Sequence, residues 1–163
     1  MHNPIKSVDV MKPALLAAAV ASLCMAAASV PAQAQNAPSG AVLLTPDKMA
    51  WKPNPRNPSQ EVSDLVGDAT KAGPYVQRVK YPPNNKVPPH THPEDRSYTI
   101  VSGTWYIAWG ETCDEAKMIA LPAGSYYTEP ANVAHCVASR GEPVVLEIRG
   151  IGPSGIKRLE AAK

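Results

Sequence analysis

Three histidines carry the clearest chemical signal in this sequence. His90 and His92 form an i,i+2 pair, His135 follows much later, and the remaining histidine, His2, stands at the N-terminus. On an extended strand an i,i+2 pair points both imidazoles to one face, where they can share a metal ion. The alternative is three unrelated histidines, each satisfied locally, but the pair and its distant companion favour a metal site.

The segment around the pair resembles the first motif of the cupin superfamily, which looks like G-x5-H-x-H-x3-E-x6-G. His90, His92 and Gly103 fit this pattern. Asn84 stands at the position of the first glycine, and Arg96 stands at the position of the glutamate.

The segment around His135 resembles the second cupin motif, which looks like G-x5-P-x-G-x2-H-x3-N. Gly124, Pro130 and His135 fit, whereas Asn132 replaces the glycine and Ser139 replaces the asparagine. Two independent spacings therefore agree with one family.

The departures from the two motifs have different physical consequences. Asn84 and Asn132 replace glycines, and asparagine is the other residue that best tolerates a positive φ, so we expect both in that conformation. Arg96 replaces an anionic ligand with a permanent cation. A triad of two histidines and one carboxylate therefore cannot be copied from the standard pattern.

The resemblance covers about residues 73–155 and implies an all-β fold, a single small antiparallel β-barrel or jelly roll. It also implies one divalent transition metal (Fe, Zn, Mn or Ni) on His90, His92 and His135, and a small-molecule ligand or substrate in the barrel mouth. Cupins often pair, so a homodimer is an open alternative. The motifs specify no reaction, because cupins include oxygenases, isomerases, storage proteins and sensors.

Several activities stay open at this point. The leading one is metal-dependent oxygenation of a small organic compound, with the metal as Lewis acid and template. The rival is a non-catalytic cupin that binds or senses a metal or a small molecule. A third is a metal-free, isomerase-like cupin with His90 or His135 as general base, and the pocket could also have lost its metal and bind a ligand by shape.

Strand alternation predicts which other side chains lie near the histidines. Counting by twos from His90 and His92 keeps Glu94, Arg96 and Tyr98 on the lumenal face, unless the turn at residues 93–95 breaks this alternation. Tyr127 and Glu129 occupy slots that are usually apolar and inward in cupins. Because a buried Arg or Glu is costly alone, we expect Arg96 and Glu129 to form a buried pair. Glu129 would then be a fourth metal ligand, with Arg96, Tyr98 and Tyr127 in the pocket; the alternative is that the pair stays solvated at the rim.

Short alternating or apolar segments recur with Gly, Pro and Asn turns between them, which predicts an all-β sandwich or barrel. The expected strands are residues 75–81, 86–92, 96–101, 104–109, 118–121, 125–129, 134–138 and 144–149. Residues 111–117 are expected to form a polar loop with one helical turn. The chain contains no Phe, so Tyr, Trp, Val and Ile must build the core.

The first 34 residues are expected to be a signal peptide that is cleaved after Ala34. Lys6 and Lys12 precede an apolar run at residues 14–30, which an Ala-x-Ala site follows. The alternative, a membrane anchor, is disfavoured because the run is short and poor in Leu and Ile. The mature protein is therefore expected to be periplasmic or secreted.

The mature chain is expected to have a loose N-terminal segment at residues 35–58, in which residues 46–58 form an edge strand or a loop, and a cupin β-barrel domain at residues 59–163. The formal net charge of the whole sequence is only +2, without a basic patch, which argues against a nucleic-acid partner or a membrane partner of the mature form. An exported compartment permits a disulfide between Cys113 and Cys136, but the sequence leaves open whether it forms.

Overall fold

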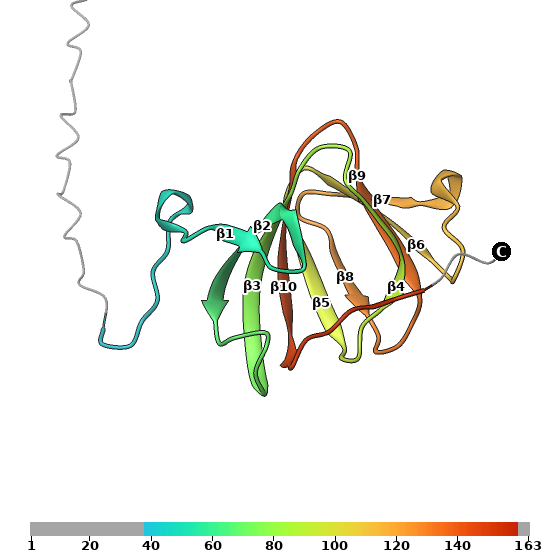
Figure 1. Ribbon diagram of the computed structural model, residues 1–163. Helices are drawn as coiled ribbons and strands as arrows, with labels where there is room; N and C mark the ends of the chain where they lie inside the picture. Colours follow the sequence, from blue (N-terminus) through green and yellow to red (C-terminus); the bar gives the residue numbers. More distant parts are fainter. Residues whose placement is uncertain (1–37, 160–163) are drawn as a thin grey trace, which may run out of the picture. The chain divides into compact units, whose positions relative to one another are not determined.

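Two antiparallel β-sheets face each other in the computed structural model, which describes residues 38–159 (Figure 1). The strand order is β1-β2-β3-β10-β5-β8 in the larger sheet and β11-β4-β9-β6-β7 in the smaller one. The chain passes repeatedly from one sheet to the other, so segments far apart in the sequence lie side by side. The expected all-β architecture is confirmed.

The larger sheet consists of β1 (Lys52–Asn54), β2 (Asn57–Val66), β3 (Gly73–Tyr81), β10 (Val144–Gly152), β5 (Arg96–Ser102) and β8 (Tyr126–Glu129). The smaller sheet consists of β11 (Lys157–Arg158), β4 (Lys86–Thr91), β9 (His135–Ser139), β6 (Thr104–Trp109) and β7 (Ile119–Pro122). Two short 3-10 helices are η1 (Pro46–Lys48) and η2 (Glu115–Lys117). Within residues 38–159, no helix has the length and apolar character needed to cross a bilayer.

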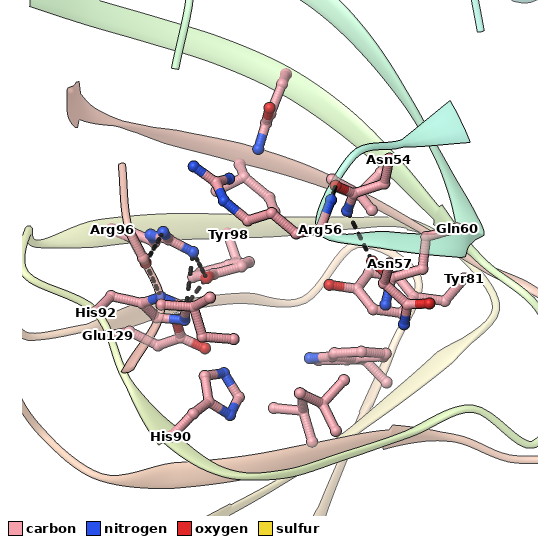
Figure 2. A pocket seen from close by; sticks show the side chains of 18 of the residues that line it. Asn54, Arg56, Asn57, Gln60, Tyr81, His90, His92, Arg96, Tyr98 and Glu129 are labelled. Carbon is pink, nitrogen blue, oxygen red and sulfur yellow. Dashed lines mark hydrogen bonds and ion pairs between the residues drawn. The ribbon is translucent and has the colours of Figure 1, made fainter. Parts of the chain in front are cut away.

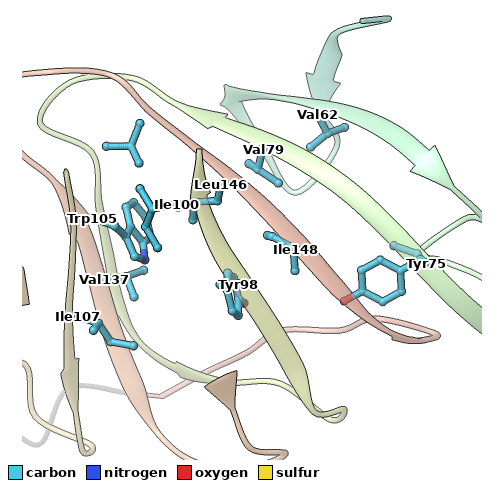
Figure 3. Packing of buried hydrophobic residues seen from close by; sticks show 12 residues of the cluster. Val62, Tyr75, Val79, Tyr98, Ile100, Trp105, Ile107, Val137, Leu146 and Ile148 are labelled. Atoms are coloured by element: carbon cyan, nitrogen blue, oxygen red, sulfur yellow. The ribbon is translucent and has the colours of Figure 1, made fainter. Parts of the chain in front are cut away.

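An apolar core fills the space between the sheets (Figure 3). On the central strand β10, Val144, Leu146 and Ile148 alternate inward and are buried. Ile100 from β5 and Trp105 from β6 close the core from both sheets. Full burial of such side chains contributes about 1.5–3 kcal/mol each, so this core stabilises the contact between the two sheets.

All eight expected strands are present, with bounds shifted by at most a few residues. β2 and β11 were not expected from the sequence. β1 and the first residues of β2 lie inside residues 35–58, so strand pairing begins within the segment expected to be loose. The expected leader at residues 1–34 lies outside the described residues.

The two asparagines that replace motif glycines both have positive φ, 57° at Asn84 and 62° at Asn132. This confirms the expectation that asparagine takes over the glycine conformation there. Asn132 also positions the site, because its backbone N–H donates to the carbonyl of His92 at 2.7 Å. The β8–β9 connection is thereby tied to the end of β4.

Cys113 and Cys136 form a disulfide, with a Cα–Cα distance of 5.8 Å. Cys136 is fully buried on β9, next to His135, and Cys113 lies in the connection between β6 and β7. The disulfide therefore ties a long, polar connection to the strand that carries one of the three histidines. The helical turn expected in this connection is present as η2.

Candidate metal centre and cavity

Four strands end at one place between the two sheets, and each brings a polar side chain there. In the smaller sheet, His90 on β4 pairs in register with His135, the first residue of β9. In the larger sheet, Arg96, the first residue of β5, pairs with Glu129, the last residue of β8. His92 follows directly after β4. Because the two sheets face each other, these side chains from distant segments converge.

His90, His92 and His135 form what we call the histidine cluster. One ring nitrogen of each lies within 4.8 Å of the others, and all three side chains are buried. The ring centroids are 4.3 to 5.2 Å apart. The sequence prediction that these residues converge is confirmed, and the cluster could hold a metal ion.

Each Nδ1 atom of the cluster lies at hydrogen-bond distance from a backbone carbonyl. The partners are Pro88 for His90 (2.7 Å), Gly155 for His92 (2.7 Å) and Val133 for His135 (3.0 Å). A carbonyl oxygen only accepts, so each Nδ1 carries the proton and donates it. Each Nε2 therefore keeps its lone pair, which is the form in which imidazole binds metals. The lone pair of His92 Nε2 accepts from Arg96 Nη1 at 3.3 Å, so a metal would take the place of this donor.

The surroundings of His135 Nε2 indicate whether the histidine cluster can accept a metal ion. The His135 side chain is 1% exposed, and this atom makes no hydrogen bond with any described residue. Glu129 Oε1 lies 3.1 Å away but outside hydrogen-bonding geometry. Buried polar atoms are normally satisfied, so a lone pair in this position fits a site built around an ion.

Burial lowers the pKa of two of the three rings. The pKa of His90 falls to about 4, through burial first and the neighbouring His135 second. The pKa of His92 falls to about 3, through burial and the positive charge of Arg96. Both rings are therefore neutral at ordinary pH, as metal ligation requires.

Glu129 lies directly beside the cluster and is held by two phenols. Tyr98 donates to Oε2, and Tyr127 donates to Oε1 at 3.1 Å. Trp105 Nε1 donates to the Tyr127 hydroxyl at 3.0 Å. Burial alone would raise the pKa of this carboxyl, but the hydrogen bond donated by the Tyr98 hydroxyl favours the charged form, and the pKa lies below its ordinary value. Glu129 is thus a buried carboxylate whose oxygens face His92 and His135 at 3.6 and 3.1 Å.

The expected direct pair between Arg96 and Glu129 is not formed. Both are buried and opposite in register, but Arg96 Nε donates to Glu94 Oε1 at 2.7 Å. The route to Glu129 runs through the hydroxyl of Tyr98, to which Arg96 Nη1 donates at 3.4 Å. The turn before β5 brings Glu94 beside the Arg96 guanidinium, so the Glu94 carboxylate pairs with it in place of Glu129. Strand alternation had placed Glu94 on the lumenal face but had not indicated that it is the partner of Arg96.

Arg96 also donates to two residues that no sequence pattern had indicated. Its Nη2 donates to the Ser154 hydroxyl at 2.6 Å and to the Gly155 carbonyl at 2.9 Å. Gly155 thereby accepts from both Arg96 and His92. The segment between β10 and β11 therefore fixes both side chains, and no pattern in its sequence indicated this.

A family model described as the ChrR cupin-like domain matches residues 39–149. This chain belongs to that cupin family. No curated protein matches it.

Solved structures share the cupin fold at low sequence identity. The polyketide cyclase RemF from Streptomyces resistomycificus is 11% identical with a TM-score of 0.61, over 76% of this chain and 88% of that one. A conserved protein with a double-stranded β-helix domain from Klebsiella pneumoniae is 18% identical with a TM-score of 0.54, over 74% and 99%. The DMSP lyase DddQ from Ruegeria pomeroyi is 15% identical with a TM-score of 0.54, over 67% and 60%. At these identities the likeness concerns the fold alone.

The cupin interior contains a cavity of about 100 Å³ beside the histidine cluster (Figure 2). This volume is enough for several waters or a small organic molecule. The expected pocket residues Arg96, Tyr98 and Tyr127 all line it, as do His90, His92 and Glu129. Arg56 and three neighbouring amide side chains also line it, and sequence reasoning missed them because they lie in a proline-rich stretch without strand periodicity.

Proposed function

We propose that this protein binds one divalent transition metal through His90, His92 and His135 and holds a small organic molecule beside it, with metal-dependent oxygenation as its reaction class. The observation that supports this most is the convergence of three buried imidazoles whose ring nitrogens lie within 4.8 Å of one another, each with its Nδ1 held by a backbone carbonyl. Three neutral histidines suit Fe, Zn, Mn or Ni as divalent ions.

A bound ion would supply Lewis acidity to a ligand at its open position. The chain's own groups would orient that ligand and manage protons. Tyr98 and Tyr127 keep the Glu129 carboxylate fixed and ionised at the cavity wall. Glu129 is therefore placed to accept a proton from a ligand bound beside the histidine cluster.

A non-catalytic binding or sensing function is the second candidate, and the position of Glu129 favours it in one respect. Together with the three histidines, Glu129 would complete four protein ligands, and a closed set of four is typical of structural zinc sites. If Glu129 instead stays with its two tyrosines, a position remains open for a ligand. Metal identity and turnover separate the two functions.

The test is elemental analysis of protein purified from the periplasm, followed by oxygen uptake with a panel of small organic compounds. We expect about one metal per chain, with metal content lost in His92→Ala while the far-UV circular dichroism stays that of a β protein. Thr91→Ala, on the neighbouring residue of the same segment, is the matched control and should keep its metal.

Bound iron with oxygen consumption supports the oxygenase, and tight zinc without turnover supports the second candidate. Absence of metal from the wild-type protein contradicts the proposal.

Export is part of the proposal and draws support from the leader pattern and from the disulfide, since disulfides persist in oxidising compartments. The mass of the same sample should correspond to a chain that begins at Gln35.

A further inference from the structure

The cavity carries positive charge that the acidic residues in the described part of the chain do not match. The charged residues that line it are Arg56, Lys86, Arg96, Arg158 and Glu129. Lys86 pairs with Glu115 at 2.6 Å, and Arg96 pairs with Glu94 at 2.7 Å. Within residues 38–159, neither Arg56 nor Arg158 has an acid within ion-pair distance. Two guanidinium groups at the cavity therefore have no carboxylate partner among the described residues.

Arg96 cannot serve an incoming ligand, because its donors are already used. Its Nε donates to Glu94, its Nη1 to Tyr98 and to His92 Nε2, and its Nη2 to Ser154 and Gly155. Arg96 is therefore a structural cation that braces this end of the cavity. Any anion that enters must find another partner.

Arg56 has donors to spare and is already oriented. Its Nη2 donates to the Ser154 carbonyl at 2.7 Å, while the Ser154 hydroxyl accepts from Arg96. Figure 2 shows the Arg56 side chain reaching across the cavity toward the side where Arg96 and Tyr98 lie. Within the described part of the chain, Nε and Nη1 of Arg56 make no hydrogen bond. One anchored nitrogen thus holds the guanidinium in place and leaves its other donors available.

The turn that carries Arg56 is itself fixed by amide groups. Asn54 Oδ1 accepts from the Arg56 backbone N–H at 3.0 Å, and Asn54 Nδ2 donates to Gln60 Oε1 at 2.9 Å. Gln60 is buried and reaches Asn85 at 3.4 Å. The short connection between β1 and β2 is therefore bonded to the barrel wall, which reduces the entropy lost when Arg56 binds a ligand.

Another part of the cavity lining is aromatic and apolar. Tyr81 and Trp105 lie with their ring centroids 4.5 Å apart, and Val79, Val137 and Ile148 complete this part of the lining. A ligand here can bury an apolar body against these side chains and keep one charged group near Arg56.

We propose that Arg56 binds the carboxylate of a small organic acid, whose apolar body packs against Trp105 and Tyr81 and whose other end reaches the histidine cluster. A planar guanidinium fork matches a carboxylate with two parallel hydrogen bonds, which a lysine cannot reproduce. The proposal rests on the proposed function only for the end of the ligand that meets the metal, because the Arg56 contact needs no ion.

Isothermal titration of the mature protein with benzoate and propionate, and with their neutral amides benzamide and propionamide, tests this assignment. We expect each acid to bind at least tenfold more tightly than its amide. Arg56→Gln should weaken binding of the acids by about 10–100-fold and leave the amides unchanged, since a charged hydrogen bond has been lost. Arg56→Lys should fall between the two. Arg140→Gln is the matched control, because Arg140 stacks on Tyr106 and does not line the cavity.

The titrations are made on metal-loaded and on chelator-treated protein. If the chelator-treated protein prefers acids and this preference depends on Arg56, the assignment is supported. The absence of metal from the purified protein would contradict only the proposed function. Acids that bind Arg56→Gln as tightly as wild type overturn the assignment, since the metal alone would then hold them. Equal binding of acids and amides by the wild-type protein overturns it as well.

Discussion

Glu129 and Arg96 show how two buried charges that lie opposite each other can serve different partners. Glu129 is 2% exposed and Arg96 is 8% exposed, and the Tyr98 hydroxyl lies between them. Arg96 is compensated by Glu94, whereas Glu129 is directed at the histidine cluster. A carboxylate that is not needed to neutralise the arginine is available to a metal or to a ligand.

Substitution of Glu129 by Gln should therefore affect metal affinity more than folding. The amide keeps the shape of the side chain and can still accept from one of the two tyrosines, but it removes the negative charge 3.1 Å from His135 Nε2. We expect metal affinity to fall by about 10–100-fold, measured by competition with a chromophoric chelator.

Glu94→Gln is the matched control for this change. It removes the partner of a buried guanidinium, so it should lower the free energy of unfolding by about 3–5 kcal/mol while metal stoichiometry stays that of wild type. Equal metal affinity in Glu129→Gln and wild type would show that Glu129 takes no part in the metal site.

At the scale of the elements, strand periodicity predicted most of the strands but not β2. β10 was found because Val144, Leu146 and Ile148 alternate with exposed or half-buried residues. β2 was missed because Gln60 and Ser63 are among its buried residues, so its inward face does not read as apolar. The histidine cluster was predictable because the spacing within each motif is local.

Contacts that residues in one loop make with residues in another part of the chain were not predictable from the sequence. Ser154 and Gly155 bind Arg96 and His92 from a segment with no strand pattern of its own. Arg56 reaches the cavity from the turn between β1 and β2. Such contacts depend on how two loops lie in space, which neither periodicity nor motif spacing encodes.

The disulfide joins two such elements, and its removal should destabilise the fold. Cys113 and Cys136 are separated by 23 residues in the chain, and closing a loop of that size restricts the unfolded state by about 3 kcal/mol. The double substitution of both cysteines by Ala should lower the free energy of unfolding by about 2–4 kcal/mol, measured by urea denaturation.

Reduction provides the control for that comparison. Wild-type protein in excess dithiothreitol should approach the stability of the double variant, and the variant itself should not respond to the reductant. Equal stability of wild type and variant without reductant would show that the bond does not form in the purified protein.

At the scale of the whole molecule, the two sheets bury a group of neutral imidazoles at one end, and this makes folding depend on pH. The pKa values of His90 and His92 are lowered to about 4 and about 3, whereas an unfolded histidine titrates near 6.5. Below pH 6.5 the unfolded chain therefore binds more protons than the folded chain, so stability falls as pH falls. We expect the melting temperature of chelator-treated protein to drop between pH 7.5 and pH 5, a window above the titration of most carboxylates.

In His90→Gln/His92→Gln this dependence should largely vanish, and a bound metal should weaken it in the wild-type protein because protons must displace the ion. A melting temperature of the metal-free wild type that stays constant over this window would show that the rings are not held neutral inside the barrel.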